Sequence, residues 1–335
     1  MRLARQRAAT ATWTGAGAEA RDTIIDLKPL AIEIEGSRPR RVQWAAPAEV
    51  PERLGAYRVL GILGEGGMAR VYAAEHALLG KRVAIKMLLP ELAAHPVVND
   101  MFLREARIAG NIRHRNLIDI HDFATDEHGV AYCVMELAVG ETLTRRLERG
   151  PLRVPRCLEI GIALADAVAA IHAAGYLHRD IKSENVLLTR DGRRLVPKLI
   201  DFGIACPLDD AGDDEAHGNL VGTPSVMAPE QIAQEPIDAR TDIWALGVLL
   251  FEMATGQLPF PPHATIREDL VAIVTEPPRP LPEELGPELR AVIDACLAKD
   301  PADRPPSAFA LVDLLRTARA GCQAPAGSWD QAAAG

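Results

Sequence analysis

Cysteine is scarce in this 335-residue chain, and its placement excludes two classes of site. The five cysteines are odd in number, widely spaced and without a Cys-x-x-Cys pair: Cys133, Cys157, Cys206, Cys296 and Cys322. A disulfide framework and a cysteine-ligated zinc site both need closer and more regular spacing. The pattern therefore favours a reducing compartment, and we expect a cytoplasmic protein.

Long apolar runs and an excess of positive charge are also missing. The longest apolar run, residues 243–251, is much shorter than the ~20 residues of a membrane helix. Residues 1–15 carry arginines but lack the apolar core of a secretory signal. The net charge of −9 lacks the basic footprint that nucleic-acid binding needs. We therefore expect no membrane span and no nucleic-acid partner.

The composition is that of a sizeable folded unit, except in the first 50 residues. Apolar residues make up 48% of the chain and charged residues 25%, as in ordinary globular proteins. Residues 1–50 differ, because they are rich in Ala, Thr and Gly and carry eight basic against six acidic residues. We predict that this extension is mostly disordered, although 23–35 alternates as a strand does.

The remainder changes character near Gly140. Before it, short β-type runs predict strands at 57–63, 70–76, 82–88, 117–123 and 131–137, with one helix across 98–110. After it, apolar and amphipathic patterns predict helices at 155–175, 241–256, 287–299 and 307–319. A strand-rich lobe followed by a helical lobe indicates an α+β fold with a cleft between the lobes.

Two features of the first lobe are typical of an anion-binding site. Gly64, Gly66 and Gly67 lie in a strand–turn–strand context, where the backbone can approach a phosphate closely. Glycine-rich turns are often only turns, so this signal alone is weak. Lys86 sits in an apolar strand and either reaches solvent or points into the cleft, with Glu105 of the following helix as a candidate partner.

A more specific set follows in the second lobe. Asp180 and Asn185 lie between a buried helix and an apolar run, and Asp201 follows an apolar strand just before a phenylalanine and a glycine. Asn and Asp oxygens suit Mg²⁺, and a further carboxylate can accept a proton from an attacking hydroxyl. Capping explains each residue singly but not the whole ordered set.

The ordered motifs "GEGGMARVY", "VAIK", "HRDIKSEN", "DFG" and "GTPSVMAPE" resemble the eukaryotic-like (Hanks-type) bacterial serine/threonine protein kinases. The resemblance covers about residues 57–316. It implies a bilobal protein-kinase fold, with a small β-rich N-lobe containing one key helix and a larger helical C-lobe. The expected boundaries are 1–54 for the extension, 55–138 and 139–319 for the lobes, and 320–335 for the tail.

The resemblance also implies roles in transferring the γ-phosphate of ATP to Ser or Thr hydroxyls of protein substrates. Asp180 would be the catalytic base, and Lys182 would steady the γ-phosphate. Thr223 would link the substrate-binding loop to both. Lys86, oriented by Glu105, would hold the α- and β-phosphates.

Asn185 and Asp201 would bind Mg²⁺. Met135 resembles the gatekeeper, and the hinge backbone that follows it would meet adenine. The residues implied in ATP binding are Leu63, Gly64, Glu65, Gly66, Gly67, Met68, Val71, Ala84, Lys86, Met135, Glu136, Ala138, Asn185, Leu187 and Asp201.

Structural roles are implied as well. Glu230 and Arg304 match a buried ion pair, and Asp242 matches a residue that braces the "HRD" backbone, although it could equally cap the helix at 241–256. Three positions depart from the family pattern. Ala69 replaces a glycine, Ser183 a proline, and Val226 an aromatic residue.

Two other functions were weighed. A pseudokinase scaffold typically lacks the Lys of "VAIK", the Asp of "HRD" or the Asp of "DFG". All three residues are present in this chain. A small-molecule kinase would lack the "GTPSVMAPE" segment that builds a peptide platform. Glu184 matches a position that reads basic residues in some substrates, although it could equally be a solvated charge. We expect regulation to come through a regulatory protein, a dimer partner, the N-terminal extension or another kinase.

The resemblance places the activation loop between Asp201 and Glu230, and one stretch of this loop has no hydroxyl group. From Ile204 to Gly222 the chain contains no Ser, Thr or Tyr, so loop phosphorylation of the usual kind has no acceptor there. The acids in this stretch are either a solvated charge run or a substitute for the phosphate. In the second hypothesis Asp213, Asp214 or Glu215 faces Arg179, the residue before Asp180.

Overall fold

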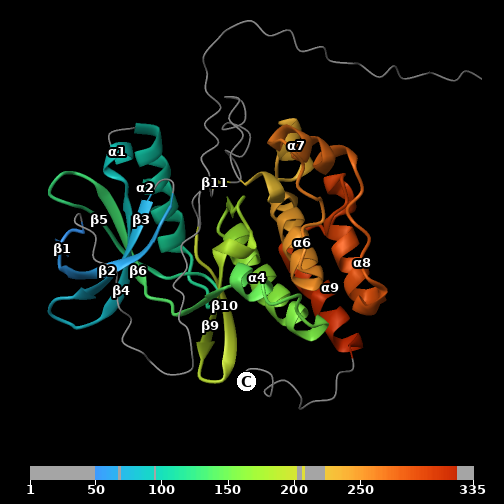
Figure 1. Ribbon diagram of the computed structural model, residues 1–335, viewed down its shortest axis with the longest axis horizontal. Coiled ribbons are helices and arrows are strands. Elements are labelled where there is room, and N and C mark those ends of the chain that lie inside the picture. The colour runs from blue at the N-terminus through green and yellow to red at the C-terminus, as the bar shows by residue number, and fades with distance from the viewer. Residues whose placement is uncertain (1–49, 67–68, 94–95, 202–205, 208–222, 323–335) are drawn as a thin grey trace, which may run out of the picture.

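The structure, a computed structural model, describes residues 50–66, 69–93, 96–201, 206–207 and 223–322, with some side chains of 96–109 left out. The predicted extension up to residue 49, its alternating stretch at 23–35 and the tail from 323 lie outside the described residues. The described residues form a sheet-based unit and a helical unit that lie side by side (Figure 1).

The first unit is built on a six-stranded antiparallel sheet in the order β1-β2-β3-β4-β6-β5. Its strands are β1 (Arg53–Leu54), β2 (Tyr57–Glu65), β3 (Ala69–His76), β4 (Arg82–Leu88), β5 (Ile120–Thr125) and β6 (Ala131–Glu136). Two helices connect β4 to β5, α1 (Pro90–Ala93) and α2 (Pro96–Asn111), and α2 packs against β5 and β6. The predicted strands and helix are therefore confirmed, with β5 beginning three residues later than expected.

The second unit is helical because its long helices are apolar on most sides and bury each other. Its helices are α3 (Leu143–Leu147), α4 (Val154–Ala173), α5 (Pro229–Ala233), α6 (Ala239–Thr255), α7 (Ile266–Thr275), α8 (Pro287–Cys296) and α9 (Ala308–Gly321). Pro155 lies in the first turn of α4, where its missing N–H costs nothing, and Gly256 ends α6 in the left-handed conformation (φ 71°). The four predicted helices are confirmed, and α3, α5 and α7 were not expected.

Short strands interrupt the helical unit, and of these the sequence pattern predicted only the one that leads to Asp201. Strands β7 (Gly140–Thr142), β9 (Val186–Asp191) and β10 (Arg194–Leu199) form one sheet, and β8 (Tyr176–Leu177) pairs with β11 (Cys206–Pro207). The run that forms β9 is too short to signal a strand against a helix by periodicity. These short strands flank the "HRD" segment and lead to Asp201 at the edge of the helical unit.

One apolar core joins the two units, from β-sheet residues such as Ile85 to Trp244 and Phe251 of α6. The predicted α+β fold, with its β-rich first part and larger helical part, is confirmed. The boundaries at 54, 138 and 319 stay predictions. Across the described ranges, every helix is too short or too polar to span a bilayer.

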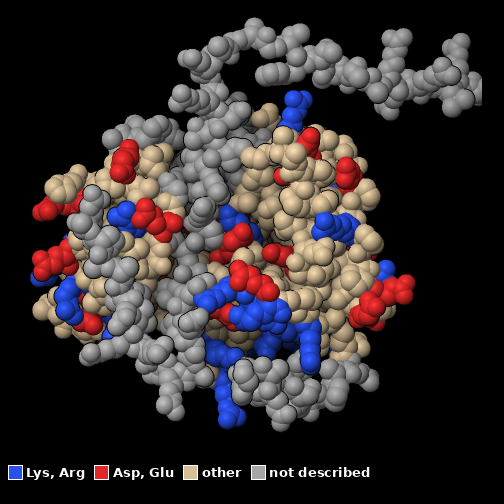
Figure 2. All heavy atoms as spheres, viewed as in Figure 1, with Lys and Arg blue, Asp and Glu red and all other residues tan. Residues whose placement is uncertain are grey.

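Charge is distributed unevenly over the surface. On the face shown in Figure 2, basic side chains gather in the lower middle, over the region of α4 and the β9–β10 hairpin. The hairpin itself contributes Arg190, Arg193 and Arg194, all exposed. This face therefore carries a basic region although the net charge of the chain is negative.

Candidate active site

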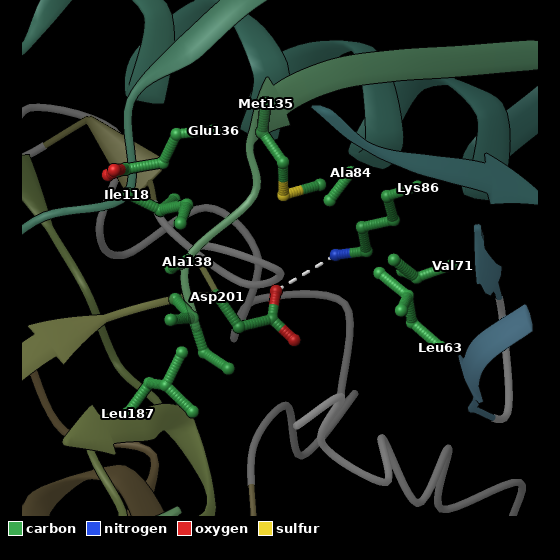
Figure 3. Close-up of a pocket in the computed structure, with 11 residues that line it drawn as sticks. Leu63, Val71, Ala84, Lys86, Ile118, Met135, Glu136, Ala138, Leu187 and Asp201 are labelled. Carbon is green, nitrogen blue, oxygen red and sulfur yellow. Dashed lines mark hydrogen bonds and ion pairs between the residues drawn. The ribbon is translucent and has the colours of Figure 1, made fainter. Parts of the chain in front are cut away.

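A pocket opens between the sheet and the helical unit (Figure 3). It encloses about 520 Å³ including its open mouth, which is in the range of small-molecule sites. Apolar side chains form most of the wall, and Lys86 and Asp201 add charge. The lining residues are Leu63, Val71, Ala84, Lys86, Ile118, Met135, Glu136, Ala138, Leu187, Ile200 and Asp201.

All but two of these residues were predicted from the resemblance. Ile118 and Ile200 were missed, and they come together because the Ile118 N–H donates to the carbonyl oxygen of Leu199 (2.9 Å). Ile118 lies in the predicted strand at 117–123 and Ile200 directly precedes Asp201, so hydrophobicity was the available signal. Alternation alone does not say which apolar side chains face a cleft between two units.

Lys86 and Asp201 meet at the charged end of the pocket. The Nζ atom of Lys86 donates to Oδ1 of Asp201 at 2.9 Å, and the two side chains are 12% and 15% exposed. Figure 3 shows both side chains pointing toward each other across the pocket. Glu105 lies in α2, but its side chain is outside the described part of the structure. Its pairing with Lys86 stays a prediction.

Asp180, Lys182 and Thr223 form a closed polar triangle. The hydroxyl of Thr223 donates to Oδ1 of Asp180 at 2.8 Å, and Lys182 Nζ donates to Thr223 Oγ1 at 2.5 Å. Lys182 Nζ also lies 2.9 Å from Oδ2 of Asp180. Asp180 and Lys182 are almost fully buried, so these contacts are held in a low-dielectric site where they are stronger than in water.

Asn185 completes this arrangement from the same segment. Its Nδ2 atom donates to the backbone oxygen and to Oδ2 of Asp180, both at 2.9 Å. Its Oδ1 atom is buried and has no hydrogen-bond partner among the described atoms. The backbone oxygen of Asn185 accepts from the N–H of Ile200 at 2.9 Å, which brings Asp201, the next residue, to the same region.

This donor set fits a hard cation such as Mg²⁺. A buried amide oxygen without a partner is costly unless something binds it, and the carboxylate of Asp201 supplies the charge. Within the described ranges, no cluster of three or more His, Cys, Asp or Glu side chains forms an all-protein metal cage. Mg²⁺ commonly takes only one or two protein ligands beside phosphate oxygens and water, so the small set is sufficient.

Asp242 of α6 holds the backbone of the "HRD" segment through hydrogen bonds. Its carboxylate accepts the backbone N–H groups of His178 and Arg179, both at 2.8 Å. Arg179 has a φ of 63°, which is strained for a residue with a side chain, and these bonds help to hold it there. The helix α6 is capped by Asp238 instead, so the capping alternative for Asp242 is wrong.

The environment of Asp242 favours its ionised form. Burial alone would raise the pKa of this carboxyl group, but the hydrogen bond with His172 (2.8 Å) and the N–H of His178 outweigh it. The pKa of Asp242 is therefore held below its ordinary value, and the carboxylate stays available as an acceptor.

The glycine-rich turn is described only in part. Gly64, Glu65 and Gly66 lie outside the wall of the pocket, and Gly67 and Met68 lie outside the described residues. The N–H of Gly66 donates to the carbonyl oxygen of Ala69 at 2.9 Å, which closes the turn. The Glu65 carboxylate accepts from Arg70 Nε at 2.7 Å, so this side chain is engaged across the two strands.

Glu136 follows Met135 at the junction of the two units, and its side chain turns away from the pocket (Figure 3). Its carboxylate accepts from Lys198 Nζ at 2.5 Å and from the N–H of Asp119 at 3.1 Å. Only the backbone of Glu136 therefore faces a ligand in the pocket.

The "GTPSVMAPE" segment is tied to the end of the helical unit. Arg304 makes two parallel bonds to the Glu230 carboxylate, at 2.7 and 2.8 Å, and the predicted ion pair is confirmed. Val226, the departure from the family pattern, is buried in a short 3-10 helix. Asp213, Asp214 and Glu215 lie outside the described residues, so the phosphate-substitute hypothesis stays a prediction.

Comparison with known proteins agrees with this geometry. Residues 57–313 match the model of the protein kinase domain. Similar curated proteins include a probable serine/threonine-protein kinase of Streptomyces coelicolor (38% identity over 78% of the chain). The serine/threonine-protein kinases PknH (36% over 79%) and PknA (35% over 81%) of Mycobacterium tuberculosis are also similar.

The chain spans 39%, 42% and 63% of the length of these three proteins, which is less than two thirds of each. The match to the family model nevertheless covers most of the chain, including every segment that forms the pocket and the polar triangle beside it. The chain belongs to the protein kinase domain family.

Proposed function

We propose that this protein is an ATP- and Mg²⁺-dependent serine/threonine protein kinase. The observation that carries the proposal is the triangle of Asp180, Lys182 and Thr223 beside a pocket of nucleotide size. Phosphoryl transfer needs little covalent chemistry from the protein, so correctly placed charges and one proton acceptor suffice.

In this proposal Asp180 accepts the proton of the attacking Ser or Thr hydroxyl. Thr223 holds the carboxylate through Oδ1, and the ammonium group of Lys182 lies close enough to stabilise charge on the transferred group. Asn185 and Asp201 would hold Mg²⁺, which would neutralise charge on the phosphate oxygens. Asn185 also fixes Asp180 through its Nδ2 atom.

ATP would occupy the pocket with its base between the apolar walls and its phosphates toward Lys86. Leu63, Val71 and Leu187 supply apolar surface, and the backbone of the segment from Glu136 to Ala138 supplies polar groups for adenine. Lys86 pairs with Asp201 at 2.9 Å, and ATP binding would exchange part of this contact for contacts with phosphate and metal.

The substrates we propose are proteins with basic residues near the phosphorylated Ser or Thr. Glu184 lies in the same 3-10 helix as Asn185 and would supply the negative charge that attracts these basic residues. A regulatory protein or a second copy of the chain would provide control, since the stretch before Thr223 lacks a hydroxyl to phosphorylate.

The test is incubation with labelled ATP, Mg²⁺ and a basic protein substrate. The protein should label Ser and Thr, and removal of Mg²⁺ with EDTA should abolish the labelling. The Asp180→Asn variant keeps the shape of the side chain but cannot accept the proton, so its rate should fall by at least about a hundredfold. Nucleotide binding with equal, near-zero labelling by both proteins would instead favour a scaffold. Labelling of a small molecule alone would favour a different kinase class.

A further inference from the structure

Ser183 lies at a point where three elements meet. Its side chain is inside the protein, at 2% exposure, between α3, α6 and the segment that carries Lys182 and Asn185. The hydroxyl of Thr144 in α3 donates to Oγ of Ser183 at 2.9 Å. The hydroxyl of Ser183 then donates to Oε1 of Glu252 in α6, also at 2.9 Å.

The two hydrogen bonds form a chain that runs from Thr144 through Ser183 to Glu252, and each group in it has the donor or acceptor that it needs. A hydroxyl has one proton, and Ser183 gives it to the carboxylate while its oxygen accepts from Thr144. The bond to a carboxylate is the stronger kind, because the acceptor carries charge. The hydroxyl thus connects two helices that the chain places 39 residues before and 69 residues after it.

The backbone at Ser183 forms only a short turn, and the side-chain contacts described above hold Lys182 and Asn185 on either side of it. Residues 183–185 form a single 3-10 turn, with Lys182 just before it, the N–H of Asn185 bonded to the Lys182 oxygen, and the N–H of Val186 bonded to the Ser183 oxygen. Such turns have poorer hydrogen-bond geometry than an α-helix and depend on their surroundings. A shift of Ser183 would displace Lys182 on one side and Asn185 on the other.

We propose that Ser183 is a positioning residue whose hydroxyl, anchored to Thr144 and Glu252, fixes the Lys182–Asn185 segment in its active geometry. Ser183 does not touch the reacting groups and acts only through its neighbours. The inference rests on the proposed kinase function for its catalytic consequence but not for its structural one.

The environment of Glu252 is consistent with this role. Burial raises the pKa of its carboxyl group to about 7, the hydrogen bond from Ser183 opposes the rise, and Glu184 adds to it. A largely buried carboxylate without a basic partner is unfavourable for stability. The hydrogen bond from Ser183 offsets part of this cost.

Two substitutions at position 183 separate the loss of the two hydrogen bonds from the loss of a fixed backbone conformation. Ser183→Ala removes both hydrogen bonds. Ser183→Pro also removes them but fixes φ near −65°, and position 183 is the first residue of the 3-10 turn, where proline is well tolerated. If the hydroxyl acts by fixing the backbone, the proline variant should recover what the alanine variant loses.

Two readouts are measured on the full chain. The first is kcat and KM for ATP with a basic protein substrate. The second, independent of activity, is hydrogen exchange of the amides of Asn185 and Val186. Ser307→Ala is the control, because it removes a capping hydroxyl from the first turn of α9, far along the chain from the site.

We expect Ser183→Ala to lower kcat by about tenfold with a smaller change in KM, since misplacement of a positioned group by about 1 Å can cost a hundredfold. Its Asn185 and Val186 amides should exchange faster, and Ser183→Pro should restore both readouts to within about threefold of the wild type. Ser307→Ala should change neither.

Unchanged exchange and unchanged kcat in Ser183→Ala would overturn the proposal, as would equal losses in Ser183→Ala and Ser307→Ala. A wild-type protein without kinase activity would refute the proposed function alone. In that case faster exchange in Ser183→Ala, reversed in Ser183→Pro, would still support the anchor, and unchanged exchange would overturn it.

Discussion

Replacing Arg304 with methionine should destabilise the protein by about 3–5 kcal/mol, because it leaves a buried carboxylate without its partner. The guanidinium group is completely buried and the side chain of Glu230 is 3% exposed. Methionine fills much of the same space, so the loss would report the missing charge and hydrogen bonds more than a cavity.

The magnitude follows from what Arg304 contacts. Two of its bonds go to Glu230, and three go to backbone oxygens of Ala298, Arg240 and Lys299 at 2.8–3.1 Å. After the substitution Glu230 keeps one bond, from the hydroxyl of Thr241 at 2.9 Å. A single neutral donor does not compensate a buried carboxylate, so the cost should lie well above the ~1 kcal/mol of an average hydrogen bond.

Urea unfolding followed by circular dichroism at pH 7 measures this loss. The matched control is Arg149→Met, because Arg149 makes an equally short bond to Glu141 (2.7 Å) but is 54% exposed. Exposed pairs contribute about 0–1 kcal/mol, since both partners regain water when the pair is broken. The effect of Arg304→Met should also persist at high salt, because buried charges are screened weakly.

A second comparison isolates the pair itself. Changing Glu230 to leucine in the Arg304→Met background removes the orphaned charge, so the double variant should be more stable than Arg304→Met alone. A loss below about 1 kcal/mol for Arg304→Met, or a loss equal to that of Arg149→Met, would refute the reasoning from burial.

Three further substitutions concern stability. Glu252→Gln should stabilise the protein more at pH 8 than at pH 5, by up to about 3 kcal/mol, and thermal unfolding across this range checks it. The sign follows because burial raises the pKa of Glu252 from 4.5 to about 7, so the native state loses stability as pH rises through this interval; a pH-independent effect would contradict it. Gly110→Ala in α2 should stabilise by about 0.5–1 kcal/mol, because an added Cβ has open space around it. Gly140→Ala should instead destabilise by about 1–3 kcal/mol, because its Cβ would collide with the backbone oxygen of Leu188 in the paired strand β9. Equal urea midpoints for the two glycine variants would show that this steric argument is wrong.

Local sequence signals were sufficient wherever one segment decides its own structure. The strand at 82–88 was predicted to the residue, because its apolar residues follow the charged pair Lys81 and Arg82 and end shortly before Pro90. The helices α4 and α6 were predicted because they are apolar over several turns. Of the strands after Gly140 only the one before Asp201 was predicted, because short runs such as 186–191 carry no period long enough to distinguish a strand from a helix.

The candidate site was likewise predictable in part from the sequence. The types and order of Lys86, Asp180, Asn185 and Asp201 can be read from the chain, because their chemistry depends on residue type and spacing. Their mutual arrangement cannot, since the bond between Lys86 and Asp201 joins residues 115 apart.

The sequence by itself determined the family, the strand-rich and helical halves, and the chemical groups available for phosphoryl transfer. Only the tertiary structure decided that Ser183 is anchored to Glu252, that Ile118 and Ile200 complete the pocket, and that Asp242 braces a backbone instead of capping a helix. The physical reason is that propensity and periodicity act over a few residues. The contacts that place a buried polar side chain depend instead on which distant segments pack beside it.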